Sequence, residues 1–114
     1  MTLPLDLAAR AKASRERIRG EILSWLREAL PAADKGSRVA RMVVFGSVAR
    51  GDFHGLSDVD LAVIGEGVRP GDLDTAALLP LERPVDVIYL DPARDPHMMA
   101  EIDRDGVTVW HRPT

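Results

Sequence analysis

Apolar residues recur every three or four positions between residues 14 and 31, which predicts an amphipathic helix. Ser14 is a suitable N-cap, and Pro31 is expected to end the helix, because the residue before a proline is disfavoured in the α region. Residues 1–13 show no comparable pattern, and Asp6 is their one candidate helix cap. We expect the apolar stripe of the helix to face the core and its charges to be solvated. The stripe consists of Ile18, Ile22, Trp25, Leu26, Ala29 and Leu30.

Three shorter segments have the composition of β-strands. Residues 39–45, 58–64 and 85–90 are rich in Val, Ile, Leu and Phe, which favour the pleated surface of a sheet. The second of them is almost uninterrupted in its apolar residues, as is typical of a strand covered on both faces. Residues 107–110 are expected to add a short edge strand.

Two further helices are predicted between and after these strands. Residues 72–81 carry apolar residues at helical spacing, with Asp72 as the candidate cap. A last helix begins after Asp95-Pro96 and ends at Gly106, since proline is favoured in the first helical turn and glycine after the last one.

The order of these elements predicts an α/β (α+β) fold with a small mixed sheet of three to four strands, flanked by helices. The linker between residues 45 and 58 is short for a parallel crossover, so the first two strands should be antiparallel. The stretch from 65 to 84 is long enough for a crossover that makes the second and third strands parallel. We expect residues 1–114 to form a single domain.

Composition narrows the class of protein. The 114 residues have a net charge of −3, which disfavours an extended nucleic-acid surface, because such surfaces are strongly basic. No apolar stretch approaches the roughly 20 residues that span a bilayer, and the N-terminus has no secretory pattern. The chain lacks cysteine, which is compatible with the reducing cytoplasm, where we expect the protein to act.

The candidate chemistry lies around the turn that follows the first strand. Gly46 and Ser47 follow that strand, and Asp58 and Asp60 begin the next one. Successive strand residues point to opposite faces, so these two carboxylates should project from the same side. A parallel third strand would bring Asp86 beside them. Because an unpaired buried carboxylate is unfavourable, we expect a positive charge among the three.

Three clustered carboxylates can hold two divalent cations, and Mg²⁺ prefers such oxygen ligands. Asp86 could also help to take a proton from an attacking hydroxyl. Gly46 would let backbone approach a phosphate, Ser47 offers a hydroxyl and an amide, and Arg50 can pair with phosphate oxygens. Together these groups favour nucleotidyl transfer from a nucleoside triphosphate. Each of them alone is an ordinary turn or cap residue.

Four nearby residues receive more ordinary interpretations. His54 and His97 have no identified partner and are read as surface residues, and Asp52 is read as a turn residue. No aromatic side chain stands out as a platform for a nucleobase, with Phe53 as the weak candidate.

The sequence Gly46-Ser47, followed by Asp58-Val59-Asp60 and later by Val85-Asp86-Val87, resembles the signature of the DNA polymerase β superfamily of nucleotidyltransferases. The fuller string Gly-Ser-x-Ala-Arg-Gly, then Ser-Asp-x-Asp-Leu, is similar to that of the minimal nucleotidyltransferases, or MNT proteins. The specific motifs occupy residues 46–64 and 85–87.

The resemblance implies a nucleotidyltransferase fold and a site with two Mg²⁺ ions held by Asp58, Asp60 and Asp86. It implies that Gly46 and Ser47 bind the triphosphate of ATP, with Arg50 nearby. It also implies a partner, since MNT proteins are commonly encoded beside a HEPN ribonuclease toxin and act as its antitoxin by transferring AMP to one of its tyrosines. With no second domain expected, the acceptor would come from a partner or another subunit.

Two other functions remain open at this point. The chain could be an antitoxin that neutralises its partner by binding alone, with a vestigial nucleotide site. It could also be the catalytic half of a small-molecule nucleotidyltransferase, of the kind that modifies aminoglycosides.

Overall fold

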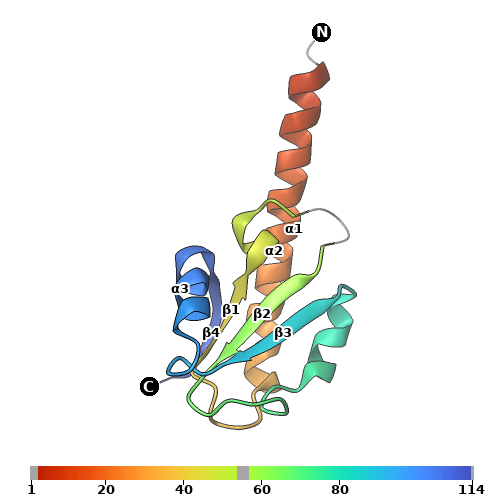
Figure 1. The fold of residues 1–114 in the computed structure, drawn as a ribbon. Coiled ribbons are helices and arrows are strands. Elements are labelled where there is room, and N and C mark those ends of the chain that lie inside the picture. Colours follow the sequence, from red (N-terminus) through yellow and green to blue (C-terminus); the bar gives the residue numbers. More distant parts are fainter. Residues whose placement is uncertain (1–2, 54–56, 114) are drawn as a thin grey trace.

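In the computed structural model, which describes residues 3–53 and 57–113, helices flank a four-stranded sheet (Figure 1). The described elements, in chain order, are α1 (Leu3–Ala33), β1 (Arg41–Phe45), α2 (Gly46–Arg50), β2 (Val59–Ile64), the 3₁₀ helix η1 (Thr75–Leu81), β3 (Val85–Leu90), α3 (Pro96–Asp105) and β4 (Val107–His111). The predicted mixed sheet flanked by helices is therefore confirmed. None of the described helices is both long and apolar enough to cross a lipid bilayer.

The strands lie in the order β3-β2-β1-β4. β1 is antiparallel to β2 and to β4, whereas β2 and β3 are parallel, as the linker lengths predicted. This topology places three chain segments at one end of the sheet: the end of β1, the start of β2 and the start of β3. β3 and β4 are the edge strands.

The two faces of the sheet are covered unequally. α1 and η1 lie over one face, where most of the buried apolar residues gather, including Leu26, Leu30 and Leu61. α3 lies over the other face and buries a smaller cluster around Ile102 and Ile64 (Figure 1). The main contacts of α3 are with β1 and α2, so the edge strand β3 has less cover on this second face.

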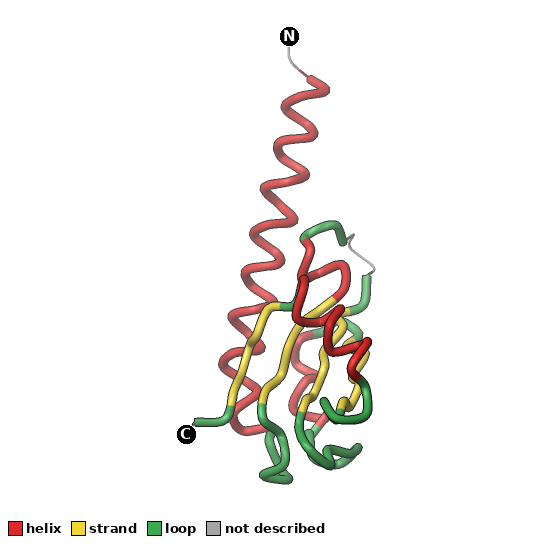
Figure 2. The backbone as a smooth tube through the Cα atoms, turned by 60° about the vertical axis from the view of Figure 1, so that its left-hand side comes forward, coloured by secondary structure: helices red, strands yellow, loops and turns green. Residues whose placement is uncertain are grey.

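α1 is much longer than the sequence predicted. It begins at Leu3 instead of Ser14, and it continues through Pro31 to Ala33. A proline removes only one helical hydrogen bond, and Ala33 is fully buried, so packing holds the last turn in helical form. The first half of α1 extends beyond the body of the molecule (Figure 2).

The second predicted helix also differs in its start. Asp74, not Asp72, is the N-cap of η1, and its carboxylate accepts a hydrogen bond from the amide of Ala76. Asp72 is instead buried, with 3% of its surface exposed, and it accepts two hydrogen bonds from the guanidinium of Arg38, at 2.7 and 3.0 Å. An aspartate suits either role, and only tertiary packing distinguishes them.

Candidate active site

The strand pairing brings the predicted site residues to one end of the sheet. In the ladder, Phe45 at the end of β1 is opposite Asp60, and Asp60 is in turn opposite Asp86 of β3. Gly46 and Ser47 begin α2 directly after Phe45. The three segments that were expected to converge are therefore adjacent.

Gly46 packs directly against Asp60. Its φ of +71° lies in the left-handed region, which disfavours residues with a side chain. A Cβ atom at this position would lie 2.3 Å from Oδ2 of Asp60, a distance that no real side chain tolerates. The amide of Gly51 donates a hydrogen bond of 2.9 Å to the carbonyl of Ser47, which closes the short helix α2. The glycine thus lets the backbone approach the carboxylate.

The charge of Asp60 is unfavourable where it lies. Partial burial raises the pKa of Asp60, and the neighbouring carboxylates of Asp86 and Asp58 raise it further, while the positive charge of Arg50 opposes this shift. Like charges this close favour the protonated form unless a cation neutralises them. The electrostatics therefore indicate a place for added positive charge.

Asp58 and Asp86 are both exposed, in contrast to the burial that the apolar context of Asp86 suggested. The difference arises because β3 is an edge strand and α3 contacts mainly β1 and α2. Within residues 3–53 and 57–113, no three acidic or histidine side chains are arranged closely enough to hold a metal ion as they stand. The three aspartates share a neighbourhood but are not drawn together around one point.

Arg50, at the end of α2, contacts a second acidic residue. Its Nε donates a hydrogen bond of 3.1 Å to Oδ2 of Asp52. About half of each side chain is exposed, at 48% for Arg50 and 61% for Asp52. The positive charge of Arg50 also acts on Asp60, so Arg50 lies near the candidate site as well as near Asp52.

Arg19 holds α2 in place and was not identified from the sequence. Its Nε donates to the carbonyl of Val48 at 3.0 Å, and its Nη2 donates to that of Ala49 at 3.0 Å. A short helix leaves its last carbonyls without partners, and the guanidinium of α1 satisfies them here. From the sequence, all charged side chains of this helix were expected to be solvated, and Arg19 was not distinguished from the others.

Two of the remaining candidate residues, Phe53 and His97, lie among the described residues. Phe53 is 3% exposed and packs in the core against the α1 face, so it cannot stack on a nucleobase. His97 lies exposed in α3, as predicted. His54 lies outside the described residues.

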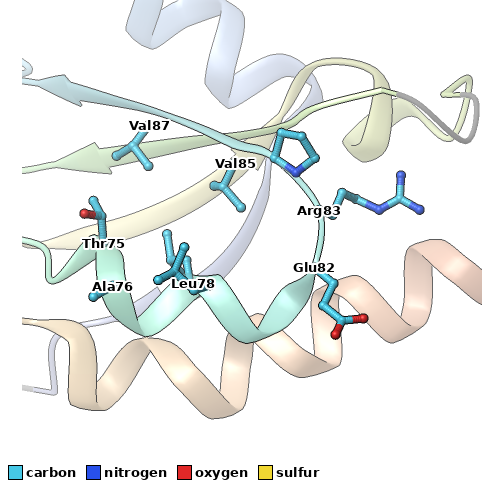
Figure 3. A pocket seen from close by; sticks show the side chains of 9 residues that line it. Thr75, Ala76, Leu78, Glu82, Arg83, Val85 and Val87 are labelled. Atoms are coloured by element: carbon cyan, nitrogen blue, oxygen red, sulfur yellow. The ribbon is translucent and has the colours of Figure 1, made fainter.

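A hollow of about 640 Å³ lies beside β3, but on the opposite face from the carboxylates. Val85 and Val87 point into it from the strand, and Leu78 lines it from η1 (Figure 3). Asp86 lies between these two valines, so the alternation of a strand directs it to the other face. This apolar hollow is therefore not part of the carboxylate site.

Comparison with known proteins now identifies the fold family. The model of the nucleotidyltransferase domain family matches residues 23–105, which is most of the chain. The chain belongs to this family. As a nucleotidyltransferase domain it is a transferase, and the matched range includes Gly46, Ser47, Arg50 and all three aspartates.

Solved structures agree with this fold. A toxin–antitoxin complex with AMP-PNP contains a chain that is 21% identical, with a TM-score of 0.51, covering 82% of this chain and 73% of that one. A mutant MntA–HpeT toxin–antitoxin complex gives 20% identity, a TM-score of 0.51 and the same coverage. A protein of Sulfolobus solfataricus that is assigned as a nucleotidyltransferase is 25% identical, with a TM-score of 0.48 and coverage of 88% and 86%. No curated protein matches the chain in sequence.

Proposed function

We propose that this nucleotidyltransferase domain transfers AMP from ATP to a hydroxyl of a partner protein, with Mg²⁺ as the required metal. The acceptor is a tyrosine of a cognate HEPN ribonuclease toxin, which the transfer neutralises, so that the chain acts as an antitoxin. The supporting observation is the position of Asp60, which lies between Gly46, the residue directly after β1, and Asp86 of β3. We also propose that residues 1–114 form one domain that acts in the cytoplasm.

The residues present fit Mg²⁺ as the metal. Asp58, Asp60 and Asp86 offer only oxygen ligands, which hard divalent cations prefer. Their mutual repulsion, seen in the raised pKa of Asp60, is relieved by such a cation. When bound, Mg²⁺ would neutralise negative charge on the phosphates and on the acceptor oxygen in the transition state.

The remaining groups position the substrates. Gly46 and Ser47 would bind the triphosphate, since the missing side chain at Gly46 leaves its backbone open to a phosphate. Arg50 would pair with phosphate oxygens through its guanidinium. The acceptor oxygen then forms a bond to the α-phosphorus of ATP, the bond to the β-phosphate breaks, and pyrophosphate leaves. Asp86, exposed at the site, would take the proton of the acceptor hydroxyl.

Two observations favour a protein acceptor. Asp58 and Asp86 are exposed at an open end of the sheet, and so a macromolecular side chain can reach them. Two of the similar structures are toxin–antitoxin complexes, and one of these holds an ATP analogue. Their resemblance to this chain is one of fold, and the assignment to the MNT group and the toxin partner form part of the proposal.

The test is intact-mass spectrometry of the protein encoded next to this one, after incubation with the chain, ATP and Mg²⁺. We expect mass steps of one AMP, and a loss of rate of about a hundredfold or more in Asp58→Asn/Asp60→Asn, because charge stabilisation in the transition state is removed. Glu28→Gln/Glu101→Gln is the matched control, since it removes two exposed carboxylates on helices outside the site.

Other outcomes would contradict the proposal. A stable complex without any mass change, and neutralisation that survives Asp58→Asn/Asp60→Asn, would indicate an antitoxin that works by binding alone. Transfer of AMP to a small hydroxylated compound, without any protein partner, would indicate a small-molecule nucleotidyltransferase.

A further inference from the structure

The face of α1 that packs on the sheet continues beyond the body of the molecule, where it becomes basic. Ile22 and Leu26 are buried on this face. Residues three and seven positions apart share one side of a helix, so Arg19, Arg15 and Lys12 continue the same face towards the N-terminus. Where the body ends, cationic side chains therefore replace the apolar ones.

These side chains line a hollow of about 300 Å³ between α1 and α2, which we call the basic hollow. Its lining residues are Lys12, Arg15, Glu16, Arg19, Ala49, Arg50 and Gly51. Arg19 is occupied by the carbonyls of α2. In the part of the chain that the structure describes, Lys12 and Arg15 take part in no ion pair. Four basic residues thus face a single acidic one.

The basic hollow adjoins the catalytic end of the sheet. Arg50 belongs to both places, because it lines the hollow and its charge also acts on Asp60. A ligand seated against Lys12 and Arg15 would lie on the side of α2 that Arg50 occupies. Such a ligand would be held next to the reacting groups.

We propose that the basic hollow binds an acidic segment of the protein acceptor and thereby presents the acceptor hydroxyl to the site. This inference rests on the proposed function, and it adds the chemistry by which the partner is recognised. Charge complementarity favours an acidic occupant, because four basic residues and one acidic residue line the hollow. A second copy of this chain offers the same basic α1, which would repel the hollow.

A protein is favoured over a nucleic acid for two reasons. None of the described residues that line the hollow is aromatic, so they offer no side chain on which a base could stack. The whole chain has a net charge of −3, whereas surfaces that bind nucleic acid are usually extended and strongly basic.

The test measures binding without ATP, so it is independent of whether AMP is transferred. The probe is a fluorescein-labelled, glutamate-rich peptide with one central tyrosine, titrated with the full chain at low salt and followed by fluorescence anisotropy. Lys12→Glu/Arg15→Glu should weaken binding by about tenfold or more, since two attractive charges become repulsive. The matched control is Arg10→Glu/Arg17→Glu, which makes the same charge change on the opposite side of α1 and should alter binding by less than about twofold.

Three results would overturn the inference. If Lys12→Glu/Arg15→Glu and Arg10→Glu/Arg17→Glu weakened peptide binding equally, binding would depend only on the overall charge of α1. Unchanged peptide binding by Lys12→Glu/Arg15→Glu would show that the peptide does not bind in the hollow. Tighter binding of a single-stranded RNA of equal charge, lost in the same variant, would make the hollow a nucleic-acid site. Lys12→Gln/Arg15→Gln, checked by thermal melting, provides a milder variant should the charge reversal disturb folding.

Discussion

Asp60 is the residue at which the stability of the fold and the proposed function make opposite demands. It is partly buried, it has carboxylates on both sides, and the Cβ-free backbone of Gly46 lies against it. Nothing in the described fold requires a negative charge here. The proposed chemistry supplies a reason for the charge, because it needs an oxygen ligand that is ionised and directed to this end of the sheet.

Asp60→Asn should therefore raise thermal stability while it abolishes transfer. The amide has nearly the same shape but no charge to be desolvated or repelled, so we expect the melting temperature at neutral pH to rise by a few degrees, as measured by circular dichroism. Asp58→Asn is the control, because Asp58 is exposed, and its loss should impair transfer with a smaller change in melting temperature. A lower melting temperature for Asp60→Asn would contradict this account of the site.

At the scale of elements, α2 depends on α1. It has only five residues, which is too short for a helix to be stable alone. The guanidinium of Arg19 binds its last carbonyls, and the buried side chains of Val48 and Ala49 anchor it in the core. The placement of Gly46 and Ser47 at the other end of α2 is thus set partly by a residue of another helix.

Arg19→Met keeps the apolar stem of the side chain and removes its hydrogen bonds to α2. We expect a loss of about 1–2 kcal/mol in the free energy of unfolding, measured by urea titration, because the carbonyls lose a charged donor. If Arg19 positions the phosphate-binding turn, the KM for ATP should rise several-fold. Arg17→Met, an exposed change on the same helix, should alter neither quantity. A loss of stability with an unchanged KM would limit Arg19 to a structural role.

The loop between β2 and η1 is fixed by another pair of charges. The Arg38 guanidinium holds the pKa of Asp72 below its usual range, and the backbone amide of Arg69, which donates to the same carboxylate, lowers it further. A carboxyl with a lowered pKa in the folded state stabilises the fold above its unfolded pKa of about 4, and this contribution is lost as the pH falls below that value.

Asp72→Asn should therefore lower stability strongly at neutral pH and much less at acidic pH. Urea titrations of the wild type and the variant at the two pH values measure the difference in the free energy of unfolding. Asp103→Asn breaks an ion pair with Arg41 that is largely exposed, so it should have little effect at either pH. A deficit of Asp72→Asn that does not shrink on acidification would show that shape, rather than charge, is what Asp72 contributes.

At the scale of the whole molecule, the sheet and α3 were predictable from the sequence, whereas the extent of α1 and the start of η1 were not. β3 begins and ends where its apolar pattern predicted, and the loop lengths were sufficient to determine which strands are antiparallel and which are parallel. Strand alternation and this topology also brought Asp60 and Asp86 together. These features depend on local sequence and on short connections, which a single sequence contains.

The missed features depend on contacts between distant segments. The first half of α1 has no apolar stripe to reveal it, because none of its described residues contributes to the buried core, which begins at Ile18. The exposure of Asp86 follows from how far α3 reaches over the sheet. Arg19 acts on α2 through contacts some 29 and 30 residues away in sequence. The hydrophobic periodicity of the sequence does not reveal such contacts between distant segments.

The protruding half of α1 also has a hydrodynamic consequence. The chain measures 57 × 30 × 25 Å, and its radius of gyration of 15.6 Å exceeds the roughly 13 Å of a compact chain of this length. An elongated particle diffuses more slowly than a sphere of equal mass, so a monomer of 12.5 kDa would elute early from a sizing column. Its elution volume would therefore equal that of a larger globular assembly. Light scattering, which measures molar mass independently of shape, would distinguish an elongated monomer from an oligomer.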